Sequence, residues 1–205
     1  MNDANHGPHV QPIALAAEMP PGLQCRLLTL DAPRMEMRVH VRRLLLDMLG
    51  EHLKMPAADL QLAFSAHGKP FCPQAESAGL SFSYSYAPPH ACVVFGPSSH
   101  IGVDIERIIT DDPTWNLLEH VFSEPELQQW LRLPAGIVRR HAFTTAWTIK
   151  EAVLKARGIG LASSPQSIGA SFTADGLAFP ATSTEYIWQH LTPAPGFTGA
   201  IVIGG

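Results

Sequence analysis

The chain has 205 residues, of which 46% are hydrophobic and 16% are charged, and its formal net charge is −4. These values fit a globular protein of one large domain or two small, closely packed ones, and they exclude an intrinsically disordered chain. The acidic balance also argues against a general nucleic-acid binder.

The first twenty residues are predicted to be a disordered tail. Residues 1–12 are polar, and the apolar run at residues 13–17 is too short for a signal peptide or a membrane span. We therefore expect a cytoplasmic protein with no membrane partner. The three cysteines include no CxxC pair, so we expect reduced thiols and neither a disulfide framework nor a zinc site.

The first half of the chain is predicted to hold one long helix followed by short strands. Apolar side chains recur at helical spacing over residues 34–53, and Pro56 lies just beyond that segment. Four segments have the composition of strands: residues 60–64, 80–86, 91–95 and 101–106. We expect the last two to pair as a hairpin, because Gly96 and Pro97 between them favour a turn.

The second half is predicted to hold two helices and a set of closing strands. The helices cover residues 124–131, with Ser123 as the N-cap, and residues 137–157, ending at Gly158. The longer helix has one buried stripe: Ala142, Ala146, Ile149, Val153 and Ala156. The closing strands are residues 171–173, 186–188 and 197–203. Long helices and β-hairpins in both halves indicate an α+β fold.

Two acidic clusters carry the chemistry. Strand alternation places Asp104 and Glu106 on one face, beside Gly102, and carboxylate oxygens are the ligands that Mg²⁺ prefers. On the long helix, Trp147, Glu151 and Lys155 follow one another at i, i+4 and i+8 and share a face. Glu151 would complete an acidic triad, and Lys155 would be directed at a phosphate. Taken singly, a solvated strand face and a surface Glu–Lys pair, worth about 0.2–0.5 kcal/mol, are the commoner explanations.

Together, the clusters resemble the paired motif of the 4'-phosphopantetheinyl transferase superfamily, with GVDIE at residues 102–106 and WTIKEAVLK at residues 147–155. Other segments resemble motifs of its larger, surfactin-synthetase-activating (Sfp-type) branch. They are GKP at residues 68–70, FNxSHS at 80–85, FSxxE at 122–126 and GxGL at 158–161. One departure stands out, because Tyr84 occupies a position where this branch usually has His.

This resemblance implies a pseudo-twofold duplication of two similar α/β halves, residues 21–99 and 100–205, with the active site in the cleft between them. It implies transfer of the 4'-phosphopantetheine group from coenzyme A to a serine of an apo carrier protein, with release of 3',5'-ADP. Acyl, peptidyl and aryl carriers are the implied partners, in fatty-acid, polyketide or nonribosomal-peptide biosynthesis. A monomer is expected, since one chain holds both halves.

The resemblance also assigns roles to single residues. Asp104, Glu106 and Glu151 match the metal-binding acids, which implies Mg²⁺ or Mn²⁺, and Glu151 and Lys155 match catalytic positions. The residues implied to contact coenzyme A are Arg42, Arg43, Lys69, Ser83, Tyr84, Asp104, Lys150 and Lys155. An exposed basic turn is the equal alternative for the two arginines.

The implied reaction explains these residue types. The carrier serine attacks the β-phosphorus of coenzyme A, Mg²⁺ and Lys155 offset the charge on the phosphates, and Glu151 takes the serine proton directly or through a metal-bound water. The rival hypotheses are a catalytically weak coenzyme A or nucleotide binder of the same fold, another magnesium-dependent phosphotransferase or hydrolase, and a structural domain whose motifs are coincidental.

Overall fold

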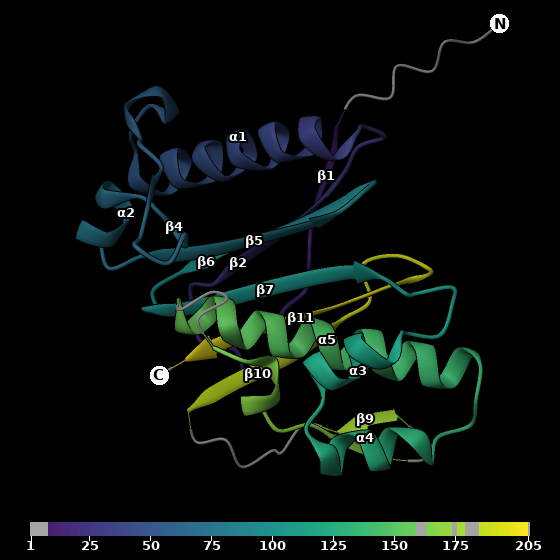
Figure 1. Cartoon of the computed structure of the whole chain (residues 1–205). Helices are drawn as coiled ribbons and strands as arrows, with labels where there is room; N and C mark the ends of the chain where they lie inside the picture. Colours follow the sequence, from purple (N-terminus) through teal and green to yellow (C-terminus); the bar gives the residue numbers. More distant parts are fainter. Residues whose placement is uncertain (1–7, 159–162, 174–175, 179–184, 205) are drawn as a thin grey trace, which may run out of the picture.

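The computed structural model describes residues 8–158, 163–173, 176–178 and 185–204, which form a mixed α/β protein with antiparallel sheets (Figure 1). Its first elements are β1 (His9–Pro12), β2 (Gln24–Thr29), α1 (Arg34–Leu53), a 3-10 helix (Ala57–Asp59), β3 (Ala63–Phe64), β4 (Pro70–Phe71), α2 (Pro73–Ser77), β5 (Ser81–Ala87) and β6 (His90–Gly96). The later elements are β7 (His100–Arg107), α3 (Trp115–Val121), α4 (Glu124–Leu131), α5 (Ile137–Arg157), a 3-10 helix (Pro165–Ser167), β8 (Ser171–Thr173), β9 (Gly176–Ala178), β10 (Tyr186–Leu191) and β11 (Phe197–Gly204).

The first sheet has the strand order β1-β2-β6-β5, and every neighbouring pair is antiparallel. Helix α1 covers one of its faces, as Figure 1 shows. The helix buries Met37, Val41 and Leu45, which belong to one apolar cluster with Leu28 and Phe95 of the sheet. Burial of this stripe against the sheet holds α1 in place.

The second sheet has the strand order β10-β11-β7, again antiparallel, and helix α5 packs on it. A Cβ atom at Gly102 of β7 would lie 1.8 Å from the Ala152 carbonyl oxygen and 2.7 Å from the Ala156 nitrogen of α5. Only glycine therefore allows the strand and the helix to approach this closely. The contact fixes how α5 lies over β7, and both elements carry site residues.

Strands β5 and β7 are the facing edges of the two sheets, and they lie side by side and point the same way (Figure 1). Within the described residues, no backbone ladder joins them. Instead, Ser83 Oγ accepts a hydrogen bond from the Val103 N–H at 3.1 Å, and Ser85 Oγ donates to Asp104 Oδ1 at 2.7 Å. Side-chain hydroxyls thus connect the sheets next to the predicted site.

The three helices predicted from the sequence are confirmed as α1, α4 and α5. Ser123 caps α4 through a reciprocal capping box with Glu126, and Gly158 ends α5 in the left-handed conformation. All residues of the predicted stripe on α5 are buried. The mixed α/β fold class is confirmed as well, whereas the pseudo-twofold relation of the halves stays a prediction. The predicted boundary at residue 99 falls between the strands of the two sheets.

Two predictions about the strands are wrong. Residues 91–95 and 101–106 form strands but no hairpin, because β6 pairs with β2 and β5 while β7 pairs with β11. The turn between them carries the chain from one sheet to the other. Of residues 60–64, only Ala63 and Phe64 form a strand, and Leu60 packs into the first core from irregular backbone.

The prediction of a disordered tail is wrong for residues 8–20. Strand β1 pairs with β2 over four residues, and Met19 is buried in an apolar cluster to which both sheets contribute. Residues 1–7 lie outside the described part of the chain. No helix in the described ranges is long and apolar enough to cross a membrane.

Candidate active site

A cavity of about 310 Å³, called the acid cavity here, lies between β5, β7 and α5. Strand β7 contributes Asp104 and Glu106, and helix α5 contributes Trp147, Glu151 and Lys155. The alternation of the strand and the four-residue spacing of the helix bring the two acidic clusters to one cavity. The other lining residues are Arg34, Tyr84, Ser85 and Tyr86.

Asp104 is the most enclosed of the three carboxylates and is only 3% exposed. Its Oδ1 accepts hydrogen bonds from Lys155 Nζ and Ser85 Oγ, both at 2.7 Å. Its Oδ2 is buried and has no hydrogen-bond partner among the residues that the structure describes. A buried carboxylate oxygen without a partner is costly, which indicates that a bound group normally completes it. The sequence prediction directed Lys155 at a phosphate, whereas here it binds Asp104 and the Val103 carbonyl.

The other two carboxylates have raised pKa values. Burial, and then repulsion from Asp104, raises the pKa of Glu106 to about 7, although Lys155, Arg34 and a hydrogen bond from Trp147 oppose the shift. Burial and Asp104 also raise the pKa of Glu151. Burial is the first cause of both shifts and repulsion from Asp104 the second, so the ionised form is disfavoured at both carboxylates.

The donor set fits a hard cation. Within the described residues, no three carboxylate, histidine or cysteine side chains lie close enough together to enclose a metal ion as placed. Nevertheless, three carboxylates line one cavity, and within the described residues one oxygen of Asp104 has no hydrogen-bond partner. A positive charge beside Glu106 and Glu151 would lower their raised pKa values. These oxygen donors are the kind that Mg²⁺ binds.

A second cavity of about 350 Å³, called the basic cavity, adjoins the first and shares Tyr84, Tyr86, Glu151 and Lys155 with it. It combines cationic and apolar side chains, which suits an aromatic ring that carries phosphate groups. Its cationic side is lined by Arg38, Arg42 and Lys69. Its apolar side is lined by Phe64, Pro70, Phe82 and Leu154.

Arg42 and Tyr84 meet in the wall of the basic cavity. Arg42 Nε donates to Tyr84 Oη at 3.4 Å, and the guanidinium lies 5.3 Å from the Phe64 ring centroid. The Arg42 Nη2 is buried with no hydrogen-bond partner. Tyr84 itself is half-buried and lines both cavities, so its hydroxyl is at the site.

Lys69 and Ser83 also line the basic cavity. Lys69 Nζ donates to the carbonyl oxygens of Ile101 and Ala156, each at 3.3 Å, and so links the β3–β4 hairpin to β7 and α5. Burial lowers the pKa of Lys69, and the charge of Glu76 partly offsets this. Ser83 is buried, with its oxygen bound to the Val103 N–H.

The burial of Lys150 contradicts its predicted contact with coenzyme A, and Arg43, also predicted to contact it, lies away from both cavities. Lys150 is completely buried and donates to Glu126 and to the Val121 carbonyl, so it cannot reach a ligand in either cavity. Arg43 points to solvent with a side-chain exposure of 82%, near Asp47, and lines neither cavity. The exposed-turn alternative is correct for Arg43 but not for Arg42.

Sequence reasoning missed three site residues. Arg34 and Arg38 line the cavities together with Arg42, and this four-residue spacing on α1 was a signal in the sequence. Ser85 was missed because its hydrogen bond to Asp104 depends on how the two sheets meet. The GxGL segment falls largely on residues 159–162, which lie outside the described residues.

Comparison with known proteins gives a consistent result. Residues 100–192 match the sequence profile of the 4'-phosphopantetheinyl transferase superfamily. Over this segment the chain is similar to that superfamily. It is 31% identical over 144 residues to a phosphopantetheinyl transferase of Thraustochytrium sp., an alignment that covers 65% of this chain and 49% of the relative.

Two further superfamily relatives come from distant organisms. The chain is 27% identical to the 4'-phosphopantetheinyl transferase HetI of Nostoc sp., over 80% of this chain and 69% of the relative. It is 28% identical to the L-aminoadipate-semialdehyde dehydrogenase-phosphopantetheinyl transferase of Schizosaccharomyces pombe. That alignment covers 56% of this chain and 48% of the relative. The matched segments thus span about half the length of two of these three relatives.

Proposed function

We propose that the protein transfers the 4'-phosphopantetheine group of coenzyme A to a serine of an apo carrier protein and releases 3',5'-ADP. The observation that carries this proposal is the direct junction of the acid cavity with the basic cavity. A site for coenzyme A needs cations and an apolar wall for its nucleotide, next to a group of carboxylates and a lysine at the pyrophosphate. Glu151 and Lys155 lie where the two cavities join.

The basic cavity would hold the adenosine and its phosphate. Arg38, Arg42 and Lys69 supply charge for the phosphate, and the rings of Phe64 and Phe82 supply apolar surface for the base. In this arrangement the Tyr84 hydroxyl, already bound to Arg42, takes the place of the histidine usual in the larger branch. The likeness in these motifs supports assignment to that branch.

Asp104, Glu106 and Glu151 would hold Mg²⁺, or Mn²⁺ in its place. When bound, the ion would neutralise negative charge on the pyrophosphate oxygens. Lys155 would stabilise the charge on the departing 3',5'-ADP, since its ammonium lies at the junction of the cavities. The serine oxygen forms a bond to the β-phosphorus as the bridging phosphorus–oxygen bond of the pyrophosphate breaks.

Glu151 is our choice for the general base that takes the serine proton. Glu151 lines both cavities, where the serine hydroxyl would approach the pyrophosphate, so it is placed to take that proton directly or through a water. We further propose that acyl, peptidyl or aryl carriers are the protein partners, that the enzyme acts as a monomer, and that it works in the cytoplasm.

The test is to incubate the protein with coenzyme A, MgCl₂ and an apo carrier protein and to measure the carrier's mass. The expected result is a gain of one phosphopantetheine group, which is lost when EDTA is added or when the carrier serine is replaced by alanine. Binding of coenzyme A without any mass gain on acyl, peptidyl and aryl carriers would overturn transfer and favour the binding-only alternative.

A further inference from the structure

A buried ion pair joins α4 to α5. Lys150 Nζ lies 2.8 Å from Glu126 Oε2, and the two side chains are 0% and 5% exposed. Such a pair gains little stability over apolar residues of the same volume, because both charges lose their hydration. Lys150 is also the residue directly before Glu151 of the acid cavity. Stability alone is therefore a weak explanation for this pair.

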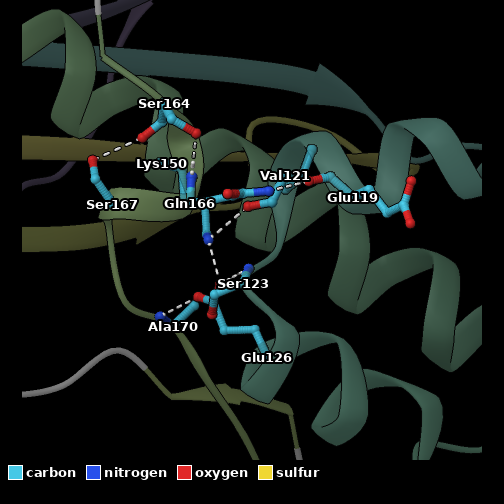
Figure 2. A network of polar contacts seen from close by, with 9 residues as sticks. All are labelled: Glu119, Val121, Ser123, Glu126, Lys150, Ser164, Gln166, Ser167 and Ala170. Carbon is cyan, nitrogen blue, oxygen red and sulfur yellow. Dashed lines mark hydrogen bonds and ion pairs between the residues drawn. The ribbon is translucent and has the colours of Figure 1, made fainter.

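The pair is the centre of a network that joins four segments of the chain (Figure 2). Lys150 Nζ donates to the Val121 carbonyl oxygen, at the end of α3, over 2.8 Å. Glu126 accepts hydrogen bonds from the backbone N–H groups of Ser123 at 2.7 Å and of Ala170 at 2.6 Å. The end of α3, the start of α4, the middle of α5 and the segment before β8 are thus fixed relative to one another.

Helix α3 connects this network with the acid cavity. Next to Val121, the His120 ring lies against the Trp147 ring, with centroids 6.3 Å apart. Trp147 lines the acid cavity together with Glu106 and lowers the pKa of that carboxylate. His120 also acts electrostatically on Glu151. Trp147 is therefore in ring contact with the helix end that Lys150 holds, and Glu151 lies within the electrostatic reach of His120.

We propose that Glu126 and Lys150 are positioning residues, which hold the end of α3 so that His120 packs on Trp147 and Trp147 stays against Glu106. Their catalytic importance rests on the proposed transfer function, but their effect on Trp147 does not. The network explains why a lysine occupies a buried position of α5, where the sequence resemblance suggested a contact with coenzyme A.

The test compares Lys150→Met with the double variant Glu126→Met/Lys150→Met. The double variant leaves no unpaired buried charge, so it should recover part of the melting temperature that Lys150→Met loses. It should not recover the position of Trp147, because Val121 and Ala170 still lack their partners. Asp112→Asn is the control. It removes the charge that pairs with Arg140 of α5 at 3.4 Å, and it leaves the network intact.

The position of Trp147 is measured by the indole N–H resonance in a ¹H–¹⁵N spectrum, assigned with Trp147→Phe. This resonance should shift in both network variants and stay unchanged in the control. Transfer kinetics should show kcat lowered about 10–100-fold in the double variant, with KM for coenzyme A within about twofold of the parent value.

A double variant with the parental Trp147 resonance and parental kcat would overturn the positioning role and leave a purely structural pair. The spectrum is recorded without substrates, so it decides the effect on Trp147 even if the parent shows no transfer at all. In that case the proposed function fails while the positioning inference is still tested.

Discussion

The Lys155 ammonium lies 2.7 Å from one carboxylate oxygen of Asp104, while the other oxygen of Asp104 is buried without a hydrogen-bond partner. Lys155 therefore compensates for one of three carboxylates in the acid cavity, and the raised pKa values of Glu106 and Glu151 reflect the remainder. A cation bound beside Asp104 would add to the positive charge of Lys155 and Arg34 and would lower the pKa values of Glu106 and Glu151.

Asp104→Asn tests this balance. The variant keeps the side-chain shape but removes a charge that a cation would need, so transfer should fall about 10²–10³-fold. We expect MgCl₂ to raise the melting temperature of the parent and to leave that of the variant unchanged, because ligands that bind only the folded state stabilise it. A parent enzyme that keeps its rate in EDTA would refute the metal assignment.

Lys155→Met should lower kcat for transfer about 10²–10³-fold while changing KM for coenzyme A much less. Methionine keeps most of the apolar stem, so the loss reports on the charge near the leaving group. Arg157→Met is the matched control, because Arg157 lies on the same helix and pairs at 3.8 Å with the exposed Glu185. Steady-state kinetics on both variants check this, and an unchanged kcat in Lys155→Met would remove the lysine from the reaction.

The raised pKa of Glu106 predicts a pH dependence of stability without metal. The folded protein binds the Glu106 proton more tightly than the unfolded chain does, because burial and Asp104 raise the pKa from 4.5 to about 7. The stabilising contribution is therefore full below pH of about 4.5 and is lost as the pH rises towards about 7. We expect the melting temperature of the parent, relative to that of Glu106→Gln, to fall over this range in EDTA. A constant difference between the two proteins would contradict the shift.

Tyr84→Phe should weaken coenzyme A binding about fivefold and leave the melting temperature nearly unchanged, since it removes one hydroxyl bound to Arg42 in the cavity wall. Tyr86→Phe is the control, because it keeps the ring over which the Arg34 guanidinium lies at 4.9 Å. Calorimetric titration of each variant with coenzyme A measures the effect. Equal affinities for parent and Tyr84→Phe would show that the hydroxyl does not replace the usual histidine.

Gly102→Ala should destabilise the protein by about 3 kcal/mol or more, because the added Cβ would overlap backbone atoms of α5 that cannot move independently. Gly169→Ala should change the free energy of unfolding by less than about 0.5 kcal/mol, since a Cβ there meets no atom within 4 Å. Chemical denaturation of both variants gives the comparison. Similar values for the two would show that the helix can shift to make room.

The helices and most strands could be predicted because local signals determine them. The capping box at Ser123 of α4, the apolar stripe of α5 and the glycine that ends α5 are all local signals. Strand pairing could not be read in the same way. The hairpin expected between residues 91–95 and 101–106 does not form, since the choice of partner depends on which sheet each strand can extend.

The site shows the same division between local and long-range information. Local periodicity was enough to place Asp104, Glu106 and Glu151 on faces that meet in one cavity. The burial of Lys150 could not be inferred, because its partner Glu126 lies 24 residues earlier on another helix. Likewise, the pairing of Lys155 with Asp104 depends on how α5 lies over β7, which the close contact at Gly102 sets.

The edge between β5 and β7 has a mechanical consequence. A backbone ladder resists shear with a row of hydrogen bonds that must break together, whereas this edge is bridged by the hydroxyls of Ser83 and Ser85. Each hydroxyl can rotate and exchange its partner for water without unfolding either sheet. Under a shearing load the two sheets should therefore separate first along the edge between β5 and β7. Both cavities lie beside this edge. Each sheet with its covering helix would then remain a stiff unit on its own side.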